Sequence, residues 1–135
     1  MTYKIDQIEG IGPHYAERLG AVGLTTTDHL LSRCATLAGR QALEEATGIS
    51  NTLIVTWANQ ADLMRISGVG SEFGQLLESA GVDTVKELAH RRPENLVVAM
   101  AHVNDLKHLT RVVPTVKVVS KRVDQAKTLE PVLSH

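Results

Sequence analysis

The sequence is poor in several features, and each scarcity excludes a class of protein. Among its 135 residues Cys34 is the single cysteine, so no intrachain disulfide framework can form, and no Cys/His zinc spacing is present. No stretch approaches the about 20 apolar residues that a membrane-spanning helix needs, and residues 1–8 lack a signal-peptide pattern. We therefore expect a cytoplasmic protein without a membrane partner, in which Cys34 is a small core residue.

Aromatic residues make up only 3% of the chain, whereas apolar residues together make up 43%. A core built mainly from Leu, Val, Ile and Ala suits helices better than a large sheet. The same scarcity argues against stacking of exposed bases along a single strand. The formal net charge is −1, so the chain lacks the overall basic character of a strong nucleic-acid binder, and any cationic patch has to be local.

Recognisable catalytic and metal-binding patterns are also missing. None of the six histidines is spaced i, i+3 or i, i+4 from another, as a helical metal site requires. The Gly68-x-Gly70 segment is not preceded by a strand, so it does not match a dinucleotide-binding loop. No nucleophile–base constellation can be argued from spacing. We expect no enzyme activity, no metal site and no organic cofactor.

The chain does contain an internal repeat. Residues 8–15, IEGIGPHY, recur 58 residues later as residues 66–73, ISGVGSEF. A fainter echo relates residues 59–61 to residues 124–126 at an offset of 65. Each strong copy has the order apolar-x-Gly-apolar-Gly before a helix. We therefore expect a single domain of residues 1–135, with one repeat in residues 1–65 and the second in residues 66–135.

Turn residues and apolar spacing predict an all-α bundle of about eight short helices. Pro13 opens the first helix, and Ser50, Ser71 and Asp83 are expected as N-caps. Short extended segments at residues 3–5 and 131–133 are expected to pair, either within the chain or between the subunits of a homodimer. The expected helices span residues 13–22, 27–33, 37–47, 51–64, 72–80, 84–90 and 93–103, with a last one between Pro114 and residue 127.

The glycines let the backbone turn tightly, and the apolar residue between them, Ile11 or Val69, is expected to enter the core. The helix that follows begins with amides that have no acceptor within the helix. Together with the helix dipole these amides form an anion site that a backbone phosphate can fill. Such a contact reads no base, so binding would be independent of sequence.

These residues resemble two known families. Gly10-Ile11-Gly12-Pro13, Gly23-Leu24-x-Thr26 and Leu30 resemble the helix-hairpin-helix motif of beta-type DNA polymerases, DNA ligases and Holliday-junction-binding proteins. Nearly the whole chain, including Trp57-x-x-Gln60-Ala61-Asp62-Leu63 and the closing Pro114…Gln125-Ala126-Lys127, resembles bacterial domain-of-unknown-function family 4332.

The motif resemblance implies that backbone amides meet one phosphate at each glycine loop: Gly10, Gly12, His14 and Tyr15 in the first, and Gly68, Gly70, Glu72 and Phe73 in the second. In some such motifs loop carbonyls also hold a monovalent cation. The corresponding carbonyls here belong to Asp6, Ile8 and Ile11, and to Met64, Ile66 and Val69.

Basic charge is concentrated near the end of the sequence. Residues 107–127 carry six Lys or Arg residues against one acid, and the patch expected to track phosphates includes Lys117, Lys121 and Arg122. Against this, His14 and Glu72 stand where DNA-binding copies often carry a cation, and a carboxylate repels phosphate. The sequence therefore leaves two functions open: non-specific binding to the backbone of DNA or structured RNA, and recognition of a protein through the same loops.

Overall fold

The computed structural model describes residues 2–135, and within them the fold is all-helical, which confirms the predicted fold class. A short 3-10 turn, η1 (Ile5–Gln7), comes first. Within residues 2–135 extended pairing is limited to one isolated antiparallel bridge between Lys4 and Thr26. The eight helices of the described chain are α1 (Pro13–Ala21), α2 (Thr27–Cys34), α3 (Leu37–Thr47), α4 (Asn51–Leu63), α5 (Ser71–Ser79), α6 (Val85–Ala89), α7 (Pro93–Lys107) and α8 (Val116–Thr128).

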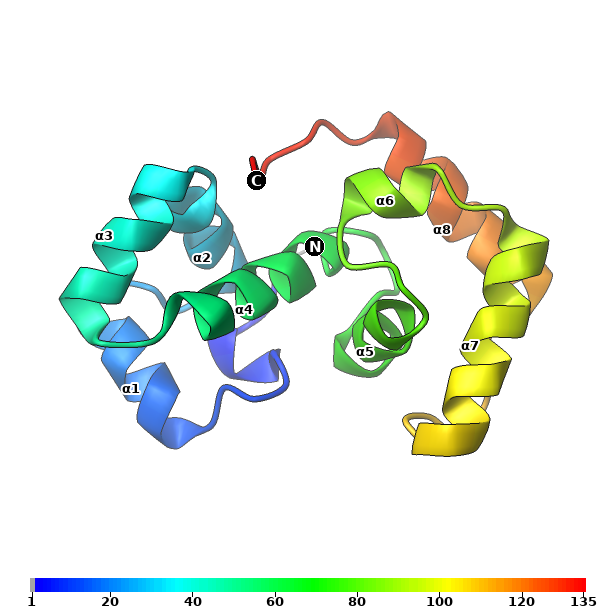
Figure 1. Cartoon of the computed structure of the whole chain (residues 1–135), viewed down its shortest axis with the longest axis horizontal. Coiled ribbons are helices and arrows are strands. Elements are labelled where there is room, and N and C mark those ends of the chain that lie inside the picture. The colour runs from blue at the N-terminus through cyan, green and yellow to red at the C-terminus, as the bar shows by residue number, and fades with distance from the viewer. Residues whose placement is uncertain (1) are drawn as a thin grey trace.

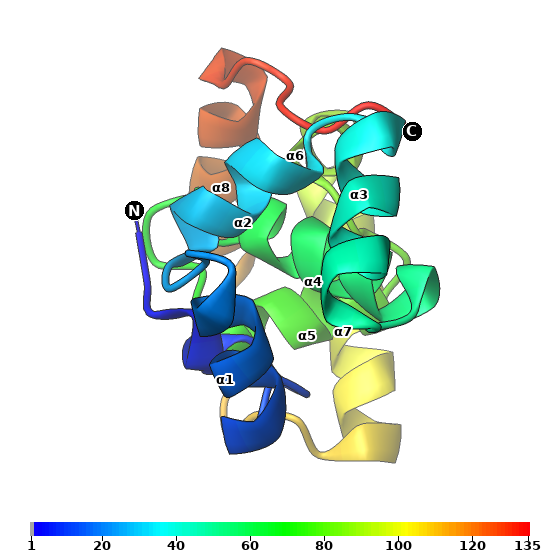
Figure 2. The ribbon, with the colours of Figure 1, turned by 90° about the vertical axis from the view of Figure 1, so that its left-hand side faces the viewer.

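The helices form two groups on either side of α4 (Figure 1). Helices α1, α2 and α3 lie on one side, and α5 to α8 lie on the other. The end view places α1, α2 and α3 together at the near side (Figure 2). Helix α4 packs against α2 and α3 and also contacts α5, so it joins the two groups. No helix within residues 2–135 combines the length and apolar character needed to cross a bilayer.

The buried apolar residues form two clusters that meet on α4. The first cluster extends from Ile5 to Met64, and Trp57 is a fully buried member of it. The second extends from Leu63 to Ala126. Since Leu63 and Met64 are sequence neighbours, the first group of helices passes directly into the second. Both clusters are largely aliphatic, as the composition predicts.

Most of the helices have a side-chain cap at their N-terminus. In five of the eight helices of residues 2–135, a hydroxyl oxygen accepts a hydrogen bond from an amide of the first turn; the caps are Thr26, Thr36, Ser50, Thr84 and Thr115. Helices α1 and α5 begin instead at Gly12 and Gly70, which offer no side chain, and α7 also lacks a side-chain cap.

Two predicted caps and one predicted helix end are wrong. Gly70 is the N-cap of α5, so Ser71 becomes the first helical residue. Thr84, not Asp83, caps α6, because its Oγ1 accepts the amide of Glu87 at 3.1 Å. Helix α7 continues past residue 103 to Lys107, and it ends at His108, whose φ is +52°.

The predicted pairing of residues 3–5 with residues 131–133 within the chain is also wrong. The amide of Ile5 donates to the carbonyl of Thr25, and the amide of Thr27 donates to the carbonyl of Tyr3, both at 2.9 Å. The C-terminal segment instead returns to the end of α2, where the Ser134 amide donates to the Ala35 carbonyl at 2.9 Å (Figures 1 and 2). The N-terminal segment thus pairs with residues 25–27, and the tail docks elsewhere.

Candidate functional site

The two glycine loops, loop 1 (residues 8–12) and loop 2 (residues 66–70), share one backbone structure. The backbone hydrogen bonds of the two loops correspond at an offset of 58 residues: Ile11 to Ile8 and Val69 to Ile66 at 3.1 Å, and Ala16 to Gly12 and Gly74 to Gly70 at 2.9 Å. The repeat in the sequence is therefore a repeat of backbone conformation.

The glycine and apolar positions of the loops have the roles that the sequence predicts. Gly10 and Gly68 adopt φ values of +91° and +83°, which side chains rarely tolerate. Between the glycines, Ile11 and Val69 are 4% and 0% exposed and anchor their loops in the two clusters. Anchored in this way, each loop presents the uncapped first turn of the next helix to the outside.

A large side chain lies behind each loop. A Cβ atom on Gly10 would lie 3.3 Å from the indole Nε1 of Trp57, and one on Gly68 would overlap the guanidinium of Arg122. Trp57 and Arg122 are separated by 65 residues, the offset of the fainter echo in the sequence. Helix α8 therefore stands behind loop 2 where α4 stands behind loop 1. The 65-residue offset was visible in the sequence, but only the fold shows that it relates the two side chains behind the loops.

The guanidinium of Arg122 has no counter-charge in the described part of the chain. Its Nε is buried without a hydrogen-bond partner. The ion pairs found within residues 2–135 join other residues, Arg65 with Asp62 and Arg91 with Glu87. An uncompensated positive charge consequently lies beside loop 2.

Lys117 and Lys121 lie one turn apart on α8 and are both exposed. They face outward because Val119, Val123 and Ala126 bury the opposite side of the helix. Neither lysine forms an ion pair within residues 2–135. Of the three predicted cationic site residues, the structure brings Arg122 to loop 2 and places the two lysines on the open face of α8.

At loop 1, the predicted site residues Gly10, Gly12 and His14 are exposed. Tyr15 is half-buried, and its ring packs edge-to-face with Trp57, with centroids 5.0 Å apart. The phenol ring thus packs against the support of the loop. The amides of His14 and Tyr15 lie in the first turn of α1, where a ligand rather than a side chain can satisfy them.

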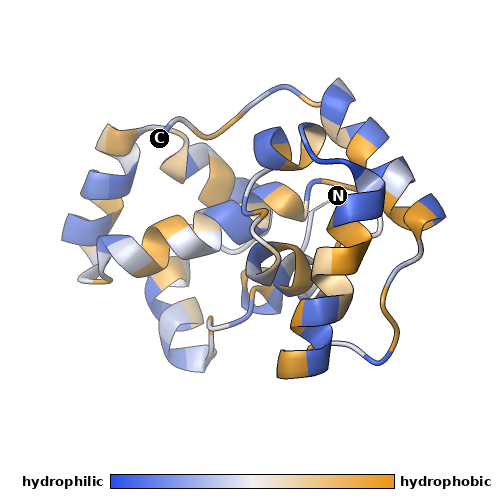
Figure 3. Cartoon of the chain, turned by 45° about the vertical axis from the view of Figure 1, so that its right-hand side comes forward, coloured by the Kyte–Doolittle hydropathy of each residue, from blue (hydrophilic) through white to orange (hydrophobic). Residues whose placement is uncertain are grey.

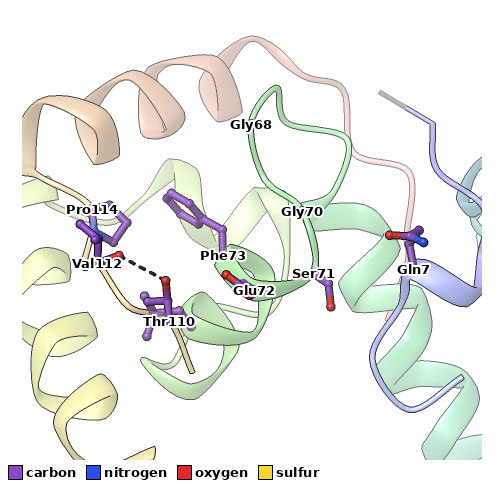
Figure 4. Close-up of a pocket in the computed structure, with 10 residues that line it drawn as sticks. Gln7, Gly68, Gly70, Ser71, Glu72, Phe73, Thr110, Val112 and Pro114 are labelled. Atoms are coloured by element: carbon purple, nitrogen blue, oxygen red, sulfur yellow. Dashed lines mark hydrogen bonds between the residues drawn. The ribbon is translucent and has the colours of Figure 1, made fainter. Parts of the chain in front are cut away.

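At loop 2, a cavity of about 510 Å³ opens beside the first turn of α5 (Figure 4). Residues of loop 2 and α5 form one wall, and residues 110–114, which join α7 to α8, form another. Glu72 is exposed at the cavity, so the sequence expectation of a carboxylate near this helix start is correct. The cavity residues that Figure 4 labels are Gln7, Gly68, Gly70, Ser71, Glu72, Phe73, Thr110, Val112 and Pro114.

Several carbonyls suggested for a monovalent cation already accept hydrogen bonds. The Ile8 and Ile66 carbonyls accept from their own loops, and the Val69 carbonyl accepts from the hydroxyl of Tyr3 at 3.4 Å. Within residues 2–135, no group of three or more His, Cys, Asp or Glu side chains could hold a metal ion.

Comparison with known proteins assigns the chain to a family. No curated protein and no solved structure matches the chain. The model of one family, described as a domain of unknown function, DUF4332, matches residues 9–129. That range includes loop 1 from residue 9 onward, the whole of loop 2, the α4 joint and the whole of α8. The repeated loops and their supporting helices are thus features of a chain that belongs to the DUF4332 family.

Proposed function

We propose that this protein is a cytoplasmic, non-enzymatic DNA-binding protein whose two glycine loops are helix-hairpin-helix motifs. They hold the sugar-phosphate backbone of DNA, or of structured RNA, without reading its sequence. The observation that carries this proposal is that α1 and α5 start at corresponding loops without a side-chain cap. Their free amides and helix dipoles favour a phosphate at each loop.

Charge on α8 supports the same function at loop 2. Arg122 supplies an unpaired guanidinium beside Gly68, and Lys117 and Lys121 extend the positive surface along the open face of the helix. A few phosphate contacts of this kind give weak binding that decreases as salt rises, because counterions are released from the nucleic acid.

Recognition of a protein is the second candidate function, and Glu72 favours it. This carboxylate is exposed in the first turn of α5, where it interacts favourably with its own helix dipole and repels an incoming phosphate. Under this alternative, loop 2 would contact the surface of a partner protein, and α8 would contribute charge complementarity.

Fluorescence anisotropy with a labelled duplex of about 20 base pairs, at two salt concentrations, tests the proposal. We expect salt-dependent binding that does not depend on base sequence. A Lys117→Glu/Lys121→Glu variant is expected to bind at least tenfold more weakly and with a smaller salt dependence. Both lysines are exposed and unpaired, so this change leaves the core intact.

The matched control is a Lys4→Glu/Lys86→Glu variant, which changes the net charge equally at two exposed lysines outside α8. Its affinity is expected to fall much less. Equal losses in the two variants would mean that net charge, not the α8 surface, governs binding. Absence of binding at low salt would contradict the proposal and favour a protein partner, to be sought by pull-down.

A further inference from the structure

We propose that the cavity beside loop 2 receives one unpaired nucleotide of the bound strand, so that the protein prefers nucleic acid with a bulged or unpaired base. This inference rests on the proposed function, in which loop 2 holds a backbone phosphate. It adds a binding site for the sugar and base that adjoin that phosphate.

The position and size of the cavity fit this ligand. At about 510 Å³ it lies within the range of about 300–1,000 Å³ that small-molecule sites occupy. One wall is formed by Gly70 and Ser71, at the uncapped start of α5. A nucleotide whose phosphate meets those amides can therefore place its sugar and base in the adjoining space without leaving the site.

The opposite part of the cavity offers apolar surface for the face of a base. Phe73 is half-buried, and its side chain extends toward Pro114 and Val112 (Figure 4). Val112 is 77% exposed, and an apolar stretch marks this α7–α8 connection in Figure 3. Stacking on an aromatic ring is tolerant of sequence because every base has an apolar face.

The comparison with loop 1 explains why a single base is expected. Tyr15, the counterpart of Phe73, has its ring against Trp57 and is already engaged in the fold. Phe73 packs against the second apolar cluster, but it is only half-buried and has no aromatic partner within residues 2–135. With aromatics forming only 3% of the chain, the protein is not suited to stack a run of bases, but Phe73 can contact one.

Polar side chains at the cavity can bind the edge of that base. Those of Gln7, Ser71 and Glu72 form no hydrogen bond within residues 2–135, so they are available to a ligand. The carboxylate of Glu72 accepts hydrogen bonds but cannot donate one when ionised. It therefore favours a base with an amino group, such as cytosine or adenine, over thymine, which presents none. Glu72, which repels a phosphate, is thus suited to accept a hydrogen bond from a base.

The test compares three labelled DNA duplexes whose ends are closed by ethylene glycol linkers, so that they have no free ends. One is fully paired, one carries a single bulged cytosine, and one carries a single bulged thymine. We expect the cytosine-bulged duplex to bind about tenfold more tightly than the paired one, within the range that one stacked base provides. The thymine-bulged duplex is expected to lie between them.

Two variants connect this preference to the cavity. Phe73→Leu retains apolar packing but removes the aromatic face, and it is expected to lower the bulge preference, the ratio of affinities for bulged and paired DNA, to near one. Glu72→Gln is at an exposed position and is expected to remove the discrimination between cytosine and thymine. Glu94→Gln, in the equivalent first turn of α7, is the matched control and should leave both ratios unchanged. Circular dichroism checks that each variant is folded.

The outcomes separate this inference from the proposed function. Salt-dependent binding of equal strength to paired and bulged duplexes would overturn the inference and leave the proposed function standing. A bulge preference that persists in Phe73→Leu would also overturn it, because kinkable DNA alone would then explain the preference. Binding to none of the three duplexes would overturn the proposed function itself.

Discussion

At the residue scale, Trp57 and Arg122 show how different side chains occupy equivalent places. Trp57 is fully buried and joins loop 1 to the first apolar cluster. Arg122 lies against loop 2 from α8, which keeps one face in solvent, and its long side chain brings a positive charge there. The two loops therefore share a backbone, but a cationic guanidinium lies behind loop 2 where a neutral indole lies behind loop 1.

Cys34 gives a residue-scale prediction about pH. Burial raises the pKa of its thiol from 9.0 to about 11, against the opposing effect of Arg40 and Arg33. The unfolded chain loses the thiol proton near pH 9, whereas the folded protein retains it up to about pH 11. Between these two pH values the Cys34 thiol is protonated in the folded protein but ionised in the unfolded chain. The free energy of unfolding therefore falls as pH rises through this window, by on the order of 2 kcal/mol.

Urea denaturation of wild type and of Cys34→Ala, at several pH values from about 8 to 10.5, measures this contribution. The difference between the two proteins is expected to narrow as pH rises, because only wild type has a thiol to ionise. The variant also corrects for the other effects of pH, which both proteins share. Parallel curves would show that the buried thiol does not contribute.

At the element scale, α1 and α5 begin alike except at their first residue. Pro13 occupies that position in α1, and Ser71 occupies it in α5. A proline is well tolerated there because the first amide of a helix has no acceptor within the helix. Helix α5 therefore offers one amide that α1 lacks, and this amide lies at the cavity of loop 2.

Ser71→Pro removes that amide and is expected to preserve the fold. Gly70 is extended, with φ −98° and ψ −162°, so it accommodates a following proline. We expect the free energy of unfolding to change by less than about 0.5 kcal/mol. Affinity for duplex DNA is expected to fall several-fold, as measured by anisotropy. Ser71→Ala, which keeps the amide, is the control, and an equal loss in both would point to the hydroxyl instead.

At the scale of the whole molecule, α4 carries the side chains that join its two halves. The amide of buried Gln60 donates to the Gly74 carbonyl at 3.2 Å. The Asp62 carboxylate accepts from the Val85 amide at 2.8 Å and pairs with Arg65 at 3.0 Å. In the first half, the amide that corresponds to that of Val85 belongs to Thr27, and the Tyr3 carbonyl accepts its hydrogen bond. The repeat therefore keeps the hydrogen bond but changes the acceptor.

Asp62→Ala is expected to weaken the second half specifically, since it leaves the buried amide of Val85 without its acceptor. A loss of about 1–3 kcal/mol is typical of such a change. Trp57, the single tryptophan, reports on the first cluster by fluorescence, and circular dichroism reports on all helices. We expect the circular dichroism midpoint in urea to fall below the fluorescence midpoint.

Asp83→Ala is the matched control, because Asp83 is exposed near the same helix and Thr84 provides the cap. It should change stability by less than about 0.5 kcal/mol. Equal shifts of both midpoints in Asp62→Ala would show that the two clusters unfold as one unit, contrary to this expectation.

The sequence by itself determined the helical class, the repeat of the two loops and most helix boundaries. Those features depend on glycine spacing, proline at a helix start and apolar periodicity, which act over a few residues. Local signals also explain the errors at Ser71 and Asp83, where two neighbouring residues could each cap a helix.

Only the tertiary structure decided which side chain lies behind loop 2. It also decided the docking place of the C-terminal segment and the presence of a cavity beside α5. Each depends on packing between residues that are far apart in the chain, such as Gly68 with Arg122 or Ser134 with Ala35. The candidate site was predicted as a set of loop glycines and cations, but the place of Arg122 within it was not. The spacing of apolar residues indicates which face of a helix is buried, and the packing of the whole chain determines which residues that face contacts.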